Sequence, residues 1–182
     1  MEHSAQLGRL NVESFPVRLP QDLEGLDGLI IPGGESTTIG KLMKEYDLMV
    51  PLRGLAKEGF PIMGTCAGLI LLAKRVSDLS LEPLGAMDLV VRRNGFGRQV
   101  DSFETDLEIP VIGEPPFHAV FIRAPFIERV GDGVVVLAGL PDGTGVAVRQ
   151  GNMLALAFHP ELTNDLRIHA YFLSIVHGDR KQ

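Results

Sequence analysis

A five-residue run, Gly-Thr-Cys-Ala-Gly at residues 64–68, constrains the fold of this chain more than any other feature. It lies between an apolar stretch at residues 60–63, which predicts a β-strand, and an apolar stretch at residues 69–75, which predicts the start of a helix. Glycines two residues before and after a central side chain relieve the crowding of a sharp strand-to-helix turn. The run therefore predicts a nucleophile elbow that presents Cys66 at the carboxyl edge of a sheet.

Strand-like and helical stretches alternate through the first half of the chain, which is typical of a parallel sheet with helices beside it. Residues 28–31 predict a strand that ends in a Pro-Gly-Gly turn, and residues 40–58 predict one helix, capped by Ser36, Thr37 or Thr38. The second half predicts β-rich segments at residues 89–91, 118–122, 133–137, 145–149 and 154–158.

The chain should end in a helix at residues 162–176 that packs Leu166, Ala170, Leu173 and Val176 on the sheet. No repeat, low-complexity tract or linker interrupts the sequence, so we expect one domain over residues 1–182. The predicted fold class is α/β, with a doubly wound, mostly parallel sheet flanked by helices.

Composition excludes several classes of function. The 182 residues are 45% hydrophobic and 22% charged, as in ordinary globular chains, and the net charge of -6 disfavours nucleic acid or an anionic membrane as partner. No apolar run approaches the roughly 20 residues that span a bilayer. A single cysteine cannot form an intramolecular disulfide, and the first ten residues lack the apolar run of a signal peptide, so we expect a cytoplasmic protein.

Cys66 is the candidate nucleophile. At the N-terminus of the predicted helix, the helix dipole and free NH groups favour the thiolate and lower the thiol pKa, and the NH of Ala67 can stabilise an oxyanion. A lone cysteine without this context would be interpreted as a small buried hydrophobic residue. The flanking glycines, strand and helix favour the nucleophilic role.

His159 is the candidate general base, because it ends the predicted strand at residues 154–158 and so lies at the same sheet edge as Cys66. Glu161, two residues later, can reach back and fix the imidazole tautomer. A histidine before proline can also be a plain loop residue. The other histidines are weaker candidates, because they lie near the chain start, after a Pro-Pro turn or on a predicted surface helix: His3, His118, His169 and His177.

Two further segments are candidates for ligand binding. In the loop at residues 32–38 the NH of Gly34 can supply a second oxyanion donor, although the loop can also be a plain tight turn. Ser36 is not expected to be a nucleophile, because residue 38 is threonine where a serine elbow needs glycine. Arg93 and Arg123 can hold a substrate carboxylate by paired donors, or they can be ordinary surface arginines.

These residues resemble the class I, triad-type glutamine amidotransferases, and within them the glutaminase subunits of pyridoxal 5'-phosphate synthase. The matching motifs lie, in the family's order, at residues 32–38, 64–68, 93–103, 121–125 and 158–162. The cysteine elbow and the His-Pro-Glu segment are shared by the whole family. The Arg-Asn-Gly-Phe-Gly-Arg-Gln and Ile-Arg-Ala-Pro segments indicate the narrower branch.

The resemblance implies hydrolysis of L-glutamine to glutamate and ammonia, with the ammonia channelled to a TIM-barrel synthase subunit that makes pyridoxal 5'-phosphate. It implies that Cys66 attacks the amide, that His159 moves the proton and that Glu161 orients His159. The NH groups of Gly34 and Ala67 would hold the oxyanion, and no metal or cofactor is implied. The implied glutamine-binding residues are Gly34, Glu35, Ser36, Arg93, Ile122 and Arg123.

The start of the chain departs from the family pattern, which has a short strand ending in Leu-Gln-Gly before a helix near an Arg-Glu-His. This chain starts with Met-Glu-His, so we expect it to enter within that helix and to lack the first strand. Residues 12–19 are then expected to close up beside the strand at residues 28–31. Two rival interpretations stay open: another cysteine hydrolase or protease on a related sheet, and a catalytically silent subunit that docks to a synthase.

Overall fold

A five-stranded sheet forms the centre of the molecule. The computed structural model describes residues 2–78, 81–93 and 102–178. In spatial order the strands of the sheet are β1 (Leu29–Ile31), β2 (Ile62–Thr65), β10 (Met153–Leu156), β9 (Gly145–Gln150) and β8 (Val135–Gly139). β1, β2 and β10 run parallel, and β9 and β8 continue the sheet in antiparallel pairing. The predicted α/β class is confirmed.

The described part of the chain forms two smaller sheets beside the central one. The first has the order β3 (Ala73–Val76), β4 (Met87–Arg92), β7 (Phe126–Val130), and the second pairs β5 (Ser102–Leu107) with β6 (Phe117–Ile122). Strands β5 and β7 were not predicted from the sequence. β6, β8, β9 and β10 lie where β-rich segments were expected, within one or two residues at most ends.

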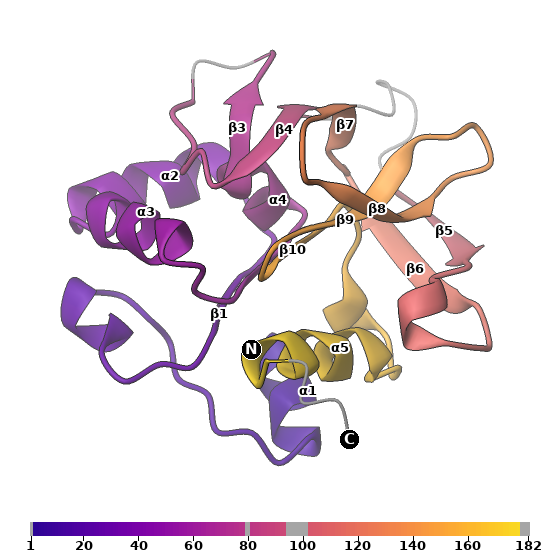
Figure 1. Cartoon of the computed structure of the whole chain (residues 1–182), viewed down its shortest axis with the longest axis horizontal. Helices are drawn as coiled ribbons and strands as arrows, with labels where there is room; N and C mark the ends of the chain where they lie inside the picture. Colours follow the sequence, from indigo (N-terminus) through magenta and orange to yellow (C-terminus); the bar gives the residue numbers. More distant parts are fainter. Residues whose placement is uncertain (1, 79–80, 94–101, 179–182) are drawn as a thin grey trace.

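Within the described residues, five α-helices flank the strands. Their bounds are α1 (Glu2–Arg9), α2 (Ser36–Glu45), α3 (Met49–Lys57), α4 (Ala67–Leu72) and α5 (Arg167–Val176), with short 3-10 turns η1 (Pro20–Leu23), η2 (Pro110–Ile112) and η3 (Pro160–Leu162). Figure 1 shows α2 and α3 on one side of β1 and β10, and α1 and α5 on the other. This two-sided arrangement agrees with the doubly wound class.

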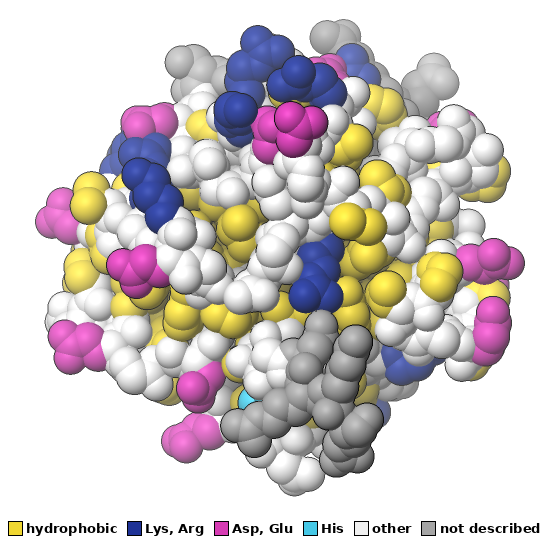
Figure 2. Space-filling model, in the orientation of Figure 1, with side chains coloured by type: hydrophobic (Ala, Val, Ile, Leu, Met, Phe, Trp, Pro, Cys, Tyr) yellow, Lys and Arg dark blue, Asp and Glu magenta, His cyan; other side chains and the backbone are white. Residues whose placement is uncertain are grey.

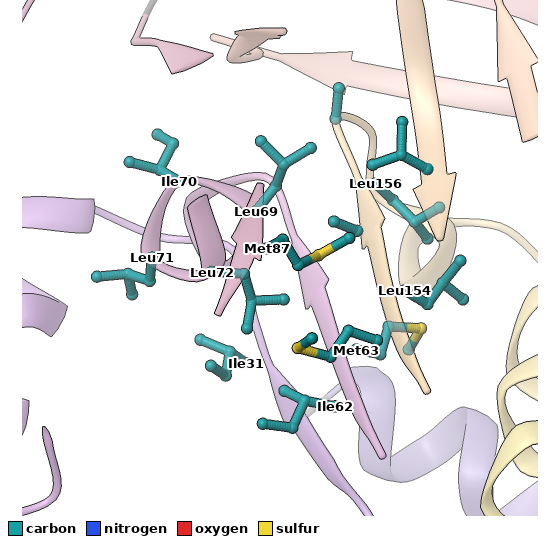
Figure 3. Close-up of a cluster of buried hydrophobic side chains, with 14 of the residues drawn as sticks. Ile31, Ile62, Met63, Leu69, Ile70, Leu71, Leu72, Met87, Leu154 and Leu156 are labelled. Carbon is teal, nitrogen blue, oxygen red and sulfur yellow. The ribbon is translucent and has the colours of Figure 1, made fainter. Parts of the chain in front are cut away.

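The short helix α4 forms the centre of the hydrophobic core. All six of its residues are buried, and Leu69, Leu71 and Leu72 are completely inaccessible to solvent. Figure 3 shows their side chains gathered in one cluster with residues of β1, β2 and β10, among them Ile62 and Leu154. Because a helix buried on every side cannot shift without opening a cavity, the core fixes where α4 begins.

The two elbow glycines let α4 lie directly on the strands. A Cβ on Gly64 would come within 2.6 Å of the carbonyl of Gly68, and a Cβ on Gly68 would come within 2.0 Å of the carbonyl oxygen of Ile31. No other residue type fits at these distances. The sequence prediction that this run is a tight strand-to-helix turn is confirmed, with β2 ending at Thr65 and α4 starting at Ala67.

The helix predicted at residues 40–58 is wrong as a single element. α2 begins four residues earlier, at Ser36, and its N-cap is Glu35 rather than the predicted serine or threonines. The chain then breaks at Asp47, whose φ of 57° lies in the left-handed region, before α3 starts at Met49. Pro51 fits the first turn of α3, where its missing NH costs nothing, but would have disrupted a continuous helix.

Two other predicted helix bounds are corrected. Residues 73–75 belong to β3, because the chain leaves α4 at Leu72 and pairs in parallel with β4. The final helix starts at Arg167 instead of residue 162, since the Asp165 carboxylate accepts the Arg167 NH at 3.0 Å.

The packed face of α5 is also different from the prediction. Its buried residues are Ile168, His169, Phe172 and Ile175, whereas Ala170 is exposed. The apolar residues of α5 recur at helical spacing along two overlapping faces of the helix. The face that is buried contains Ile168 and Phe172.

β1 is the edge strand of the central sheet. Among the described residues it is hydrogen-bonded only to β2 within the sheet, which leaves one side of its backbone without a strand partner. Residues 12–18 have no regular secondary structure, so the expectation that residues 12–19 close up beside β1 is wrong. The start of the described chain is helical, as the family resemblance implied.

The charged surface is mixed in sign. Figure 2 shows basic side chains gathered over the β3–β4–β7 sheet. Some of these are paired with carboxylates of the same sheet: Lys74 lies 3.1 Å from Asp88, and Arg92 lies 3.7 Å from Glu128. This sheet therefore presents paired charges instead of a field of one sign.

The close contact between α4 and β1 predicts that two glycine-to-alanine substitutions will change the stability of the protein in opposite directions. Gly68→Ala should destabilise the protein by about 3 kcal/mol, because the new methyl group overlaps the Ile31 carbonyl oxygen. Gly54→Ala is the matched control in helix α3, where nothing lies within 4 Å of the added Cβ, and it should stabilise by about 1 kcal/mol. Urea unfolding measures both, and equal effects would contradict the close packing of α4.

Candidate active site

Cys66 occupies a strained backbone position between β2 and α4. Its φ of 51° and ψ of -103° are unusual for a residue with a side chain, and its NH is held at 2.8 Å by the carbonyl of Leu156 in β10. Such strain persists only where the surrounding structure fixes it, and it is found at functional sites. The side chain is 7% exposed, and Sγ lies 3.7 Å from the carbonyl oxygen of Ile122.

His159 approaches Cys66 from the end of β10. Its NH donates to the carbonyl of Val120 in β6 at 2.8 Å, which fixes the backbone where the strand ends. The ring is hydrogen-bonded to Glu161 through Nδ1 at 2.7 Å. Cys66 lies close enough to raise the pKa of His159, and with Nδ1 taken by the carboxylate, Nε2 is the ring nitrogen left to face the sulfur. The structure thus brings Cys66, His159 and Glu161 together in that order.

The charges of this group support one another. Burial alone disfavours the imidazolium of His159, but the hydrogen bonds and negative charges of Cys66 and Glu161 outweigh it and raise the pKa of His159. Burial likewise disfavours the carboxylate of Glu161, but the hydrogen bond with His159 and the charge of His3 lower its pKa. A positively charged His159 beside the anionic Glu161 is the arrangement that these two shifts favour.

The loop after β1 lies against this pair. A Cβ on Gly33 would stand 2.4 Å from Cε1 of His159 and 3.5 Å from Cβ of Cys66, so only glycine permits the observed approach. Gly34, with φ of 147°, adopts a conformation that other residues rarely take. Ala67, the second predicted oxyanion donor, is the first residue of α4 and is buried.

Glu35 is committed to capping α2. Its carboxylate accepts the NH groups of Thr37 and Thr38 at 3.1 Å and 2.7 Å, and both hydroxyls as well, which lowers its pKa to about 2. Arg93 donates to the same carboxylate at 3.2 Å. The structure thus joins two of the predicted glutamine-binding residues in one exposed cluster.

The remaining predicted binding residues lie around the same loop and strand end. Ser36 is 2% exposed, and its Oγ has no hydrogen-bond partner among the described residues. Ile122 ends β6 and is 40% exposed, and Arg123 follows it with φ of 44° and an exposed side chain. Of the motif predicted at residues 93–103, residues 94–101 lie outside the described residues.

Two histidines that the sequence analysis ranked low lie next to this site. His169 was expected on a helix surface but is completely buried, and its Nε2 is 2.9 Å from Nδ1 of His3. His3 in turn lies 3.2 Å from Thr65 and 3.4 Å from Glu161. Only the tertiary structure joins residues so far apart in sequence. By contrast, His118 is exposed on β6 between Asp106 and Glu104.

The described ranges contain neither a metal-binding cluster nor a membrane-spanning helix. Within residues 2–78, 81–93 and 102–178, no three His, Cys, Asp or Glu side chains are arranged to hold a metal ion. In the same ranges no helix combines the length and apolar character needed to cross a bilayer.

Comparisons with known proteins agree on one family. Residues 1–177 match the model of the SNO glutamine amidotransferase family. The chain is 58% identical over 178 residues to "Pyridoxal 5'-phosphate synthase subunit PdxT" of Herpetosiphon aurantiacus, covering 96% of this chain and 94% of that protein. The protein of the same name from Moorella thermoacetica is also 58% identical, covering 96% and 93% of the two chains.

Solved structures extend the same likeness. A crystal structure described as a glutamine amidotransferase superposes with a TM-score of 0.92 at 51% identity, covering 97% of this chain and 93% of the other. A protein from Thermoplasma acidophilum, described as part of a putative GMP synthase, superposes with a TM-score of 0.68 at 19% identity, covering 98% and 88%. The second likeness is one of fold alone.

The electrostatics of the site predict the effect of removing one charge. Glu161→Gln should lower the pKa of His159, because the carboxylate contributes both a hydrogen bond and a negative charge that favour the imidazolium. NMR titration of the histidine Cε1 resonances measures this shift. Glu104→Gln is the control, since it should lower the pKa of the exposed His118 and leave His159 unchanged. An unaltered His159 titration in Glu161→Gln would contradict the described pairing.

Proposed function

Since this chain belongs to the SNO glutamine amidotransferase family, we propose that Cys66, His159 and Glu161 are the triad with which it hydrolyses glutamine. The chain is the glutaminase subunit of a pyridoxal 5'-phosphate synthase, as its PdxT relatives are named. One observation supports the assignment of the triad: the only cysteine, in a strained elbow, lies beside a histidine whose pKa it raises and whose Nδ1 is bound to a buried carboxylate.

The first half of the reaction uses the paired charges of Cys66 and His159. The thiolate attacks the side-chain amide carbon of glutamine, and the carbonyl electrons move onto oxygen to give a tetrahedral oxyanion. When that intermediate collapses, the C–N bond breaks and His159 gives its Nε2 proton to the leaving nitrogen. Ammonia departs, and a glutamyl thioester remains on Cys66.

The second half restores the enzyme. The now neutral His159 accepts a proton from water, and the resulting hydroxide attacks the thioester carbon. The C–S bond breaks, glutamate leaves, and the thiolate and the imidazolium are regenerated. Glu161 stays anionic throughout, holding Nδ1–H of His159 and stabilising its positive charge.

The oxyanion needs donors that are in place before the reaction begins. The NH groups of Gly34 and Ala67 are our candidates, one in the loop that covers the Cys66–His159 pair and one at the start of α4. Ala67 follows the nucleophile directly, as oxyanion donors do in elbow enzymes.

The α-amino and α-carboxylate groups of glutamine require polar partners beyond the triad. We assign them to the loop and strand end around Cys66, where Ser36 has a buried hydroxyl with no partner among the described residues and Ile122 turns its carbonyl toward Sγ. Arg93 and Arg123 supply the positive charge for the carboxylate. Glu35 contributes through its backbone and by capping α2, because its carboxylate is already occupied by Thr37 and Thr38.

The product of the reaction, ammonia, explains why this subunit works with a synthase partner. Ammonia released in bulk water would be lost, so this glutaminase delivers it to the synthase subunit, for which we propose a TIM-barrel fold. We further propose that residues 1–182 form a single glutaminase domain that works in the cytoplasm without a metal or cofactor. One contiguous hydrophobic cluster, which reaches from Leu23 to Ile175, supports the single domain.

Cys66→Ala tests the proposed nucleophile. It should reduce ammonia release from glutamine to below about a thousandth of the wild-type rate, measured in complex with the synthase subunit. The fold and the docking to the synthase should survive, because the glycines at 64 and 68 determine the turn and the thiol does not.

Residual hydrolysis well above that level would identify another nucleophile. Peptide and ester substrates, assayed in parallel, distinguish a glutaminase from a general cysteine hydrolase. A wild-type complex that releases no ammonia would instead identify a silent docking subunit.

A further inference from the structure

A buried pair of histidines lies behind Glu161, and the reaction described above does not use it. His3 comes from α1 and His169 from α5, two helices on the same side of the central sheet. The His3 side chain is 11% exposed, and His169 is completely buried. Their rings are joined by a 2.9 Å contact between Nδ1 of His3 and Nε2 of His169.

This pair is continuous with the triad through the second oxygen of Glu161. Oε1 of that carboxylate is bound to His159, whereas Oε2 is buried with no hydrogen-bond partner among the described residues. Nε2 of His3 lies 3.4 Å from Oε2. The same nitrogen lies 3.2 Å from Oγ1 of Thr65, the residue before Cys66. His3 therefore contacts both the carboxylate and the elbow.

Only one arrangement of protons suits these contacts. A bare Nε2 on His3 would direct a lone pair at the Glu161 carboxylate, so Nε2 carries the proton, donates it to Oγ1 of Thr65 and lies with its positive edge 3.4 Å from Oε2. Nδ1 of His3 must then accept, and Nε2 of His169 donates to it. The atom left without a partner among the described residues is Nδ1 of His169, which carries only a lone pair in this tautomer.

We propose that His3, supported from behind by His169, is a positioning residue that holds Oε2 of Glu161 so that Oε1 stays aimed at Nδ1 of His159. The proposal rests on the function proposed above. It adds a fourth and a fifth member to the buried chain of polar groups behind Cys66. Their role is to orient Glu161 and the elbow, and neither touches the substrate.

The protonation states of His3 and His169 are consistent with a role in orienting Glu161. Burial lowers the pKa of His3, the negative charge of Glu161 opposes this, and the positive charge of His159 adds to it. Burial and the neighbouring His3 lower the pKa of His169 to about 4. The titratable groups that face His3 are thus Glu161, His159 and His169, with Glu2 on its own helix. Near neutral pH both histidine rings are neutral. His3 can therefore orient its neighbours through its Nε2–H without changing the net charge of the triad.

The test distinguishes a role of His3 in orienting Glu161 from a role in stabilising the fold alone. In complex with the synthase subunit, His3→Leu should lower kcat for ammonia release about 10- to 100-fold with KM for glutamine unchanged, because a misdirected carboxylate leaves His159 free to turn. His3→Gln should keep most of kcat, since its amide nitrogen can occupy the place of Nε2. His169→Leu should lower kcat less than His3→Leu, and His169→Gln should restore it.

Gln6→Met is the matched control. Gln6 is also a buried polar residue of α1, and its Nε2 donates to the carbonyl of Thr163 at 2.5 Å, whereas no hydrogen bond joins it to Glu161 in the described part of the chain. It should lower the thermal midpoint about as much as His3→Leu while leaving kcat unchanged. If Gln6→Met reduces kcat as much as His3→Leu, the effect of His3 is only the docking of α1, and the proposal is overturned.

A double-mutant cycle supplies the decisive comparison. If His3 acts through Glu161, adding His3→Leu to Glu161→Ala should not reduce the residual rate further. An equal fold-loss in both backgrounds would overturn the proposal, and so would a wild-type kcat in a folded His3→Leu protein. If His3→Leu does not fold, the same cycle with His169→Leu decides. Failure of the proposed function is distinguishable, because the wild-type complex would then release no ammonia at all.

Discussion

The site depends on one close contact, the approach of helix α4 to strands β1 and β2 at Gly64 and Gly68. The two glycines leave no room for a Cβ, and the side chains of α4 fill the core around them. With the helix fixed, the single residue between β2 and α4 must reverse the chain direction with a positive φ. Cys66 is therefore held at the sheet edge by packing that involves no catalytic group, and this makes the elbow robust to changes in the thiol itself.

Burial and charge act against each other throughout the site. The charged form of each of these groups is disfavoured by its loss of water, and each is stabilised by a partner: His159 by Cys66 and Glu161, and Glu161 by its hydrogen bond with His159. A buried charge that lost its partner would be strongly destabilised, so these residues can be expected to depend on one another in mutational experiments. The chain of contacts reaches α1 and α5, which ties the geometry of the nucleophile to helices far from it in sequence.

The parts of the site whose geometry depends on a short stretch of chain could be predicted from the sequence. The glycine spacing predicted the elbow, and the ends of two apolar strands placed Cys66 and His159 at one sheet edge, where the structure brings them together. Their catalytic roles stay a proposal. His3 and His169 were ranked low because nothing in their local sequence distinguishes them, and only the packing of α1 and α5 brings them to Glu161.

The elements that were missed have the same kind of explanation. The break at Asp47 needs a left-handed residue that periodicity does not reveal, although Pro51 was a signal that the helix could not be continuous. β5 alternates exposed with partly or fully buried residues, but its exposed positions include Glu104 and Asp106, which weaken its strand signal. Which of two overlapping faces α5 buries is decided by its neighbours and not by its own pattern.

The most direct test of this account is covalent labelling with a diazoketone analogue of glutamine, followed by peptide mass spectrometry of the complex with the synthase subunit. After His159 protonates the diazo carbon, the thiolate of Cys66 should displace N2 and form a thioether. We predict a single adduct on Cys66, the only cysteine, that glutamine prevents from forming. An adduct on another residue, or labelling that glutamine does not slow, would contradict the claim that this elbow is the glutamine-hydrolysing site.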